Sequence, residues 1–320
     1  MKTKQIDEGH AVDIGNELIS RHFSRSKSKN LQFKNDSTLY RFVEDDMANA
    51  LNASTSECAA SSASVLGENL RNQILKLYNT FITPDGREVD YKAMAASKQF
   101  AEYEWTSAQL QRVDLRSAER NVRLAFFINI YNALVIHATI KSGAPTNMWT
   151  RYKFFNQNFY IISGMPFTLQ DIENGILRGN KKGVGMLFLP FSKNDTRRNL
   201  IVDNGEPKIH FALNCGAKSC PPIKTFSAEN INEELKLACE SFLEDPSNCS
   251  LNIEKKKLTL SKIFDWYKVD FGTTPSNLVK WVCENIGGGK IQEGLKELLN
   301  EGAAVSVDFS TYNWTNNAKT

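Results

Sequence analysis

Apolar residues recur at helical spacing along several stretches between residues 70 and 299. In 70–81, Leu70, Ile74, Leu77 and Tyr78 lie three or four positions apart, which predicts an amphipathic helix with one buried face. The same spacing predicts further helices over 169–177, 230–243, 276–286 and 291–299. Two shorter helical runs are expected between residues 91 and 122.

The stretch from Leu124 to Ile140 is different, because it is apolar on all sides of a helix. Its 17 residues sit at the lower limit for crossing a bilayer, and they include the polar residues Asn129, Asn132 and His137. A helix that is apolar all round is typical of the interior of a large soluble domain. We therefore predict a buried helix and no transmembrane segment.

Extended structure is predicted at four places. Residues 208–213 alternate apolar and polar positions up to a break at Gly216, and two prolines at 221 and 222 prevent the strand from continuing. The other extended runs are 159–162, 251–260 and 304–314. Helices and strands interleave without a regular strand–helix–strand repeat, which favours an α+β fold: mixed helices around a small antiparallel sheet, with the apolar helix buried at the centre.

The chain divides into three parts by composition. Residues 1–47 read as a helix followed by two short strands, and residues 48–68 hold a Ser- and Ala-rich low-complexity stretch typical of a linker. Residues 69–320 form the large domain. We expect the two folded units to be separated by the linker.

The overall composition and charge of the chain argue against some classes of function. The chain has 320 residues, of which 41% are hydrophobic and 23% charged, and a formal net charge of +3. Such a charge, without a basic stripe interleaved with aromatic residues, argues against nucleic-acid binding. Six cysteines without a secretory signal ahead of them predict a reducing, cytoplasmic setting with free thiols. No cofactor is expected.

The candidate chemistry gathers in one short stretch. His210, Cys215, Ser219 and Cys220 fall within eleven residues at the end of the predicted strand. A thiol nucleophile needs an imidazole to take its proton, and in the large domain the imidazole is either His210 or His137. We expect the chain to double back after His210 and bring sulfur and imidazole together.

A histidine that acts as a base needs a group that orients it. Glu173 and Asp270 are candidate orienting carboxylates, while the amides of Asn129 and Asn132 are candidates for orienting a histidine or for donating to an oxyanion. The alternative is that these polar residues, like the cysteines taken one at a time, are hydrogen-bonded or buried core residues without chemistry.

Three other interpretations stay open. His210, Cys215 and Cys220 are possible zinc ligands with His137 as a fourth, although their spacing matches no standard zinc signature. Cys215 and Cys220 are also a possible disulfide or redox pair, with four residues between them. Finally, the domain is possibly a non-catalytic interaction platform.

Several separated motifs resemble the family of uncharacterised domains called DUF547 over residues 70–315. They are DGREVDY at 85–91, AFFINIYNALVIH at 125–137, LQDIENGILR at 169–178, IHFALNCGAKSCP at 209–221, Trp266 with Asp270-Phe271, and Tyr312-Asn-Trp314. Family members often have Tyr-Asp-Trp at the last motif, so a carboxylate is missing at Asn313. The resemblance adds a similarity to papain- or transglutaminase-like thiol enzymes.

Residues 1–47 resemble the C-terminal half of a DEP domain, on Ala11-Val12, Gly15, Leu18, Phe33 and Leu39–Phe42. A DEP module ahead of a DUF547 domain implies a signalling setting, with a protein partner or a membrane surface bound through the DEP remnant. The sequence therefore predicts a cytoplasmic protein, with a membrane-peripheral location as the alternative. Its Cys–His centre is expected to be made from Cys220, Cys215, His210, His137, Glu173 and Asn132.

Overall fold

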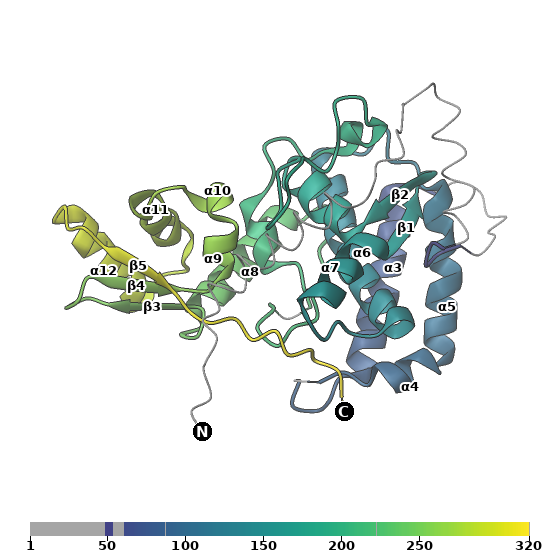
Figure 1. The fold of residues 1–320 in the computed structure, drawn as a ribbon, viewed down its shortest axis with the longest axis horizontal. Coiled ribbons are helices and arrows are strands. Elements are labelled where there is room, and N and C mark those ends of the chain that lie inside the picture. Colours follow the sequence, from purple (N-terminus) through teal and green to yellow (C-terminus); the bar gives the residue numbers. More distant parts are fainter. Residues whose placement is uncertain (1–48, 54–60, 87, 222, 320) are drawn as a thin grey trace, which may run out of the picture.

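The computed structural model describes residues 49–53, 61–86, 88–221 and 223–319. The expected DEP-like unit at 1–47 lies outside these residues. The described chain has α+β character, with helices joined to two small sheets. Figure 1 shows a larger helical body and a smaller lobe, with α8 (Ile231–Glu244) between them.

The helical body is built on α6 (Arg120–Ser142), whose residues 124–139 are all buried. It packs most extensively against α3 (Ala63–Phe81), with α4 (Tyr91–Ala95), α5 (Lys98–Ser107), the 3₁₀ turn η1 (Ala108–Arg112) and α7 (Met148–Gln157) completing the body. By length and composition α6 is the one described helix able to cross a membrane, yet 89% of its most apolar window is buried inside the protein. This burial is typical of a core helix.

The start of α3 lies within the stretch expected to be a linker. Ser62 caps the helix through the amide of Val65, and Leu66 is buried one turn later. Asn52 is also buried, and its amide donates to the carbonyl oxygens of Ser107 and Ile161. Both ends of the expected linker therefore pack against the helical body.

A hairpin and a π-helical segment follow α7. Strands β1 (Phe159–Ile162) and β2 (Met165–Thr168) pair antiparallel, and the turn between them has positive φ at Ser163 and Gly164, as two-residue hairpin turns require. The predicted strand at 159–162 is confirmed. The Thr168 hydroxyl accepts from the Asp171 amide, which begins η2 (Asp171–Leu177).

The smaller lobe holds a three-stranded sheet. Strands β3 (Cys249–Asn252) and β4 (Lys257–Leu260) pair antiparallel, but β5 (Ser306–Phe309) pairs parallel to β4. The expectation of a purely antiparallel sheet is therefore wrong. The reason is that β5 returns to the sheet after four helices: α9 (Ile263–Trp266), α10 (Lys268–Phe271), α11 (Pro275–Asn285) and α12 (Gly289–Asn300).

The strand predicted at 208–213 is also wrong. Residues 207–211 form the 3₁₀ helix η4 (Pro207–Phe211), which follows the 3₁₀ helix η3 (Thr196–Leu200). Pro207 at the first position lacks the amide that a strand ladder needs, and Glu206 caps the amide of Lys208. The alternating apolar residues are buried by a helical turn instead.

The C-terminal tail joins the two parts of the molecule. Figure 1 shows it leaving β5 in the smaller lobe and running back across the helical body, where the chain ends. Val89 pairs in parallel with Ala318 near that end, and the Tyr91 hydroxyl donates to Asn317 Oδ1. The segment that follows the last motif is thereby brought beside residues of the first motif.

Candidate functional site

The predicted centre lies on a loop of residues 214–221 that a buried amide on α6 holds in place. Asn132 Nδ2 donates to the carbonyl oxygen of Ala212 over 3.0 Å, and its Oδ1 accepts from the amide of Asn214 over 2.9 Å. Both polar atoms of the Asn132 side chain therefore form hydrogen bonds with backbone groups. Asn132 therefore positions the loop and has no free group to offer a substrate.

Asn214 then closes the loop from within. Its Oδ1 accepts from the amide of Gly216 over 2.8 Å, and its Nδ2 donates to the carbonyl oxygen of Pro221 over 2.7 Å. Gly216 has a φ of +81°, which a residue with a side chain rarely adopts. The turn at Gly216 folds the chain back, so that Cys215 and Cys220 face each other.

The C-terminal tail fixes the other side of the loop. The amides of Lys218 and Ser219 donate to the carbonyl oxygens of Thr315 and Asn313, respectively. In the opposite direction, the amide of Asn317 donates to the carbonyl oxygen of Gly216. The Asn313 side chain accepts from the Thr315 amide, which an aspartate would do equally. The side-chain amide of Asn313, which replaces the family's carboxylate, therefore shapes the tail and does not face the sulfurs.

The two sulfurs are in direct contact. Cys215 Sγ and Cys220 Sγ lie 2.6 Å apart, and both thiols are free. Cys220 Sγ also accepts from the Cys215 amide over 3.1 Å, and the Tyr312 hydroxyl lies 3.3 Å from Cys220 Sγ and 3.7 Å from Cys215 Sγ. Donors therefore converge on Cys220 from its own loop and from the tail.

This environment separates the acidities of the two thiols. Burial alone would raise the pKa of Cys220, but the hydrogen bonds from Cys215 and Tyr312, together with backbone amides, outweigh it and lower the pKa to about 7. The pKa of Cys215 is raised well above its usual value, because its thiol donates to Cys220 and because it is buried. Cys220 therefore ionises more readily than Cys215.

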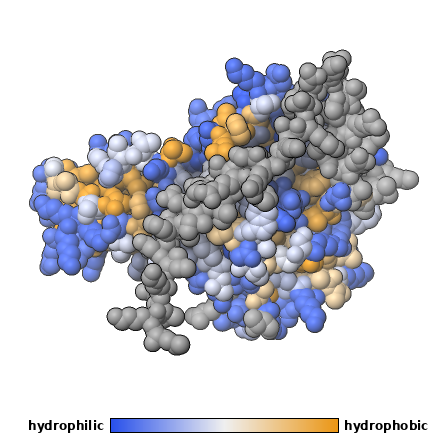
Figure 2. Space-filling view, viewed as in Figure 1, coloured by the Kyte–Doolittle hydropathy of each residue, from blue (hydrophilic) through white to orange (hydrophobic). Residues whose placement is uncertain are grey.

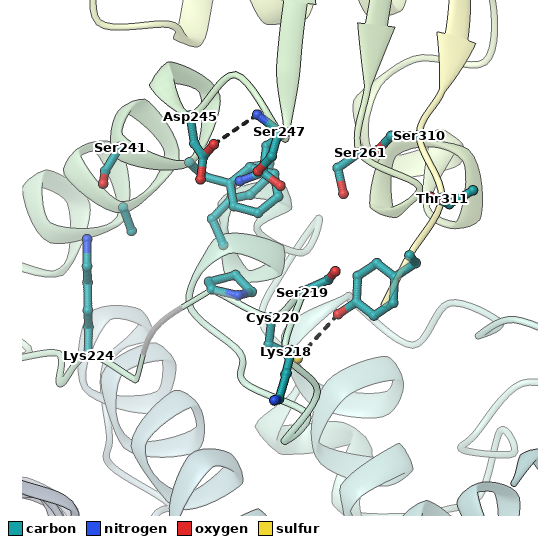
Figure 3. A pocket seen from close by; sticks show the side chains of 16 residues that line it. Lys218, Ser219, Cys220, Lys224, Ser241, Asp245, Ser247, Ser261, Ser310 and Thr311 are labelled. Atoms are coloured by element: carbon teal, nitrogen blue, oxygen red, sulfur yellow. Dashed lines mark hydrogen bonds between the residues drawn. The ribbon is translucent and has the colours of Figure 1, made fainter. Parts of the chain in front are cut away.

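Cys220 lies on the wall of a pocket of about 370 Å³ between the helical body and the smaller lobe. Figure 3 shows Cys220 at its base with the tyrosine of the tail beside it, and serines from several elements above. Its polar lining is mostly hydroxyl and amine groups, from Lys218, Ser219, Lys224, Ser241, Ser247, Ser261, Ser310 and Thr311. The sulfur of Cys220 is therefore accessible from this hydrophilic pocket.

His210 is engaged by a carboxylate. Its Nε2 lies 2.9 Å from Asp270 Oδ2, and both side chains are nearly fully buried. Arg178 Nε donates to the same oxygen over 2.6 Å, and Lys181 Nζ to Oδ1 over 2.8 Å. Burial opposes ionisation of Asp270, but its hydrogen bonds to His210 and Arg178 outweigh this effect and hold the pKa of Asp270 well below the usual range. Of the two carboxylates considered, Asp270 is therefore the one that contacts His210.

Glu173 takes a different position from the one predicted. Its carboxylate accepts from the hydroxyls of Tyr131, over 3.0 Å, and Tyr267, over 2.6 Å, and it makes no hydrogen bond with either described histidine. The ring of Tyr267 stacks on the imidazole of His210 with centroids 3.9 Å apart. Burial raises the pKa of both phenols, and the nearby Cys215 adds to the effect. Glu173 therefore holds two buried phenols, one of which stacks on His210.

His137 belongs to a separate cluster. Its Nδ1 lies 2.8 Å from the Tyr160 hydroxyl, while its Nε2 is 3.6 Å from Glu104 Oε1, too far for a hydrogen bond. Burial lowers its pKa. No hydrogen bond among the described residues joins His137 to either cysteine of the loop, so the structure gives it no role at the candidate site.

The expected contact between sulfur and imidazole is not present. The chain does double back after His210, but the described residues contain no hydrogen bond between either sulfur and the rings of His210 or His137. The turn at Gly216 brings sulfur to sulfur instead. No group of three or more His, Cys, Asp and Glu side chains able to hold a metal ion occurs in the described ranges.

Four contributors were not predicted from the sequence as site residues: Tyr312, Tyr267, Asn214 and Arg178. Each stands in or next to a motif quoted above, yet nothing local marks its role. Arg178 is 92 residues from Asp270, and Tyr312 is 92 residues from Cys220. Only the fold reveals these pairings.

Comparison with known proteins identifies one family. Residues 115–243 match the model of "Protein of unknown function, DUF547", less than half of the chain. The matched range contains α6, η2 and the cysteine loop, whereas Asp270 and Tyr312 lie beyond it. Comparisons with curated proteins and with solved structures find no match. The family description names no activity, so the chemistry must be argued from the site.

Proposed function

We propose that the cysteine loop is a thiol–disulfide exchange centre, in which Cys220 attacks a substrate disulfide and Cys215 resolves the product. The observation that carries the proposal is the direct contact of the two sulfurs, 2.6 Å apart, with opposite shifts of their pKa values. An attacking thiol is most effective when its pKa is close to the ambient pH. Cys220, with a pKa of about 7, meets that condition.

The reaction balances with these two residues and a disulfide. The Cys220 thiolate attacks one sulfur of the substrate, forming a mixed disulfide and expelling the other sulfur as a thiolate. Cys215 then gives its proton to the thiolate expelled in the first step and attacks Cys220 Sγ, releasing the second substrate sulfur as a thiolate that takes a proton from water. The centre loses two electrons to become a disulfide, and the substrate is reduced to two thiols. Two equivalents of a small-molecule thiol return the centre to its reduced form and leave as a disulfide.

The surroundings support both steps. The amide of Cys215 and the hydroxyl of Tyr312 stabilise the attacking thiolate, while the raised pKa of Cys215 keeps the second thiol protonated until the first step is complete. The hydroxyl- and amine-lined pocket suits a polar substrate such as a peptide disulfide. We therefore expect hydrophilic disulfides to be better substrates than apolar ones.

The test is turnover. Full-length protein carrying Cys58→Ser is mixed with reduced glutathione and bis(2-hydroxyethyl) disulfide, and disulfide consumption is measured against the uncatalysed rate. We expect catalysis that is lost in Cys220→Ser and strongly reduced in Cys215→Ser. Exchange no faster than the uncatalysed reaction contradicts the proposal and favours the non-catalytic docking alternative.

The buried His210–Asp270 pair favours a second candidate, acyl hydrolysis or transfer by Cys220. In that reaction the imidazole accepts or donates the proton, and Asp270, 2.9 Å from Nε2, orients it. A rearrangement that brings the other ring nitrogen to Cys220 is required. Turnover of p-nitrophenyl acetate that disappears in His210→Gln but persists in Cys215→Ser supports this candidate over the first, since exchange needs Cys215 and acyl transfer does not.

A further inference from the structure

One surface loop of the helical body exposes four large apolar side chains. Val184, Leu187, Phe188 and Leu189 are 51%, 61%, 79% and 51% exposed. Figure 2 shows apolar surface bordered by hydrophilic surface on the upper edge of this face. Contiguous exposed apolar residues rimmed by polar ones mark interaction sites in soluble proteins.

The loop is held firmly at both ends. Arg178 Nη1 donates to the carbonyl oxygen of Lys182 over 2.8 Å. On the far side, the amide of Phe191 donates to Asn180 Oδ1 and its carbonyl oxygen accepts from Asn180 Nδ2, while the ring is fully buried against Gly175. The apolar tip is therefore presented by a fixed base, with Phe191 as the internal anchor.

The stretch around the tip is strongly basic. Residues 179–200 contain three lysines and two arginines against a single acid, Asp195, giving a net charge of +4 where the whole chain carries +3. Asp195 is paired with Arg197. Lys182, Lys193 and Arg198 are exposed. Apolar side chains thus occur on one short segment with cations that form no ion pair with any described acidic residue.

We infer that this loop docks the protein on an anionic lipid membrane. Apolar side chains surrounded by cations match the boundary of such a bilayer, where acyl chains lie beneath negatively charged headgroups. Phe188 and its neighbours enter the headgroup–acyl boundary, and Lys182 and Lys193 contact lipid phosphates. An uncharged apolar partner would leave these cations without a counterpart, so charge complementarity selects the membrane.

The loop is also connected to the candidate site. Arg178, which holds the carbonyl of Lys182, binds Asp270, and so does Lys181. Asp270 in turn binds His210. The docking loop and the buried His210 network therefore share one carboxylate, and the docking inference stands without any assumption about the chemistry of the cysteines.

Vesicle sedimentation tests the inference. Full-length protein is mixed with phosphatidylcholine vesicles, with or without 30% phosphatidylserine, at low and at 0.5 M salt, choices that follow from screening of surface charge. We expect binding to the anionic vesicles and its loss at high salt. The double variant Leu187→Ser/Phe188→Ser should bind at least about tenfold more weakly, and Lys182→Glu/Lys193→Glu at least about fivefold more weakly.

Matched controls separate the loop from general effects. Leu237→Ser removes an apolar side chain that is 53% exposed on α8, and Lys280→Glu reverses an exposed charge on α11. Both should bind like the unmodified protein. No preference for anionic vesicles, or loop variants that bind as tightly as the controls, overturns the inference. The second result would assign any vesicle binding to another part of the chain.

Discussion

The hydroxyl of Tyr312 lies 3.3 Å from Cys220 Sγ, although 92 residues separate them in the chain. The tail that carries Tyr312 is bound to the cysteine loop by backbone hydrogen bonds at Lys218 and Ser219. The acidity of Cys220 is therefore a property of the assembled fold, because one of its donors arrives only when the C-terminal tail docks.

Replacing Tyr312 with phenylalanine should raise the pKa of Cys220 by about 1–2 units, since a hydrogen bond to a charged group contributes about 1.5–3 kcal/mol. The thiolate fraction at pH 7 then falls, and the greater nucleophilicity of the less acidic thiolate offsets only part of the loss. We expect alkylation by iodoacetamide at pH 7 to slow about two- to eightfold. Tyr152→Phe, on exposed surface, should leave the rate unchanged.

In the Cys58→Ser protein, the alkylation rate should rise with pH to half its maximum near pH 7, because the pKa of Cys220 is lowered to about 7. Cys239 and Cys249 are buried and burial raises the pKa of each to about 12, so they should not react in the folded protein. Peptide mapping identifies the labelled residue. Label on any cysteine other than Cys220 would contradict this assignment.

Asn132 and Asn129 offer a matched pair, because each clamps a backbone amide and a carbonyl oxygen, Asn132 at the cysteine loop and Asn129 at Phe226. Either alanine variant should lower the free energy of unfolding by about 1–3 kcal/mol by leaving buried backbone groups unpaired. Only Asn132→Ala should also slow alkylation of Cys220. Equal slowing in both variants would show that the loop responds to general loss of stability, not to its own clamp.

Asp270→Asn should lower the free energy of unfolding by about 3–5 kcal/mol, because it leaves the guanidinium of Arg178, 2% exposed, without its counter-ion. Asp265→Asn breaks a half-exposed pair with Lys262 and should cost about 0–1 kcal/mol. Urea unfolding at pH 7 measures both. A cost for Asp270→Asn no larger than that of the control would contradict the buried network.

The same variant has a defined pH dependence. The pKa of Asp270 is lower in the folded protein than in the unfolded chain, so its contribution to stability is present above the unfolded value of about 3.9 and is lost as the pH falls through the folded value. The stabilities of the unmodified protein and of Asp270→Asn should therefore converge in acid. A difference that stays constant down to the lowest pH would show that the carboxylate charge is not what stabilises the network.

Local pattern predicted most of the helices, because apolar spacing reports which face is buried. The helices expected over 230–243, 276–286 and 291–299 correspond to α8, α11 and α12. The pattern failed at 208–213, where alternation of apolar residues fits a strand as well as a buried 3₁₀ turn, and the proline at 207 decided the outcome.

The site was predictable only where its members are close in sequence. Cys215 and Cys220 were found because five positions separate them, and a glycine turn between them can bring the sulfurs together. Tyr312, which bonds to Cys220, comes from the tail, and Asp270, which bonds to His210, comes from α10, so no spacing rule could assign either partner. Two imidazoles were available as bases, but the sequence did not show that one would bind Asp270 and the other Tyr160.

The most direct test of the exchange centre is to trap its intermediate. Reduced Cys58→Ser protein, with and without Cys215→Ser, is incubated with oxidised glutathione at pH 7, and the intact mass is measured. The account predicts that Cys215→Ser keeps one glutathione on Cys220, while the protein with both loop cysteines loses two hydrogens, as an internal disulfide forms, and carries no glutathione. A stable glutathione adduct when both cysteines are present, or no reaction at Cys220, would contradict it.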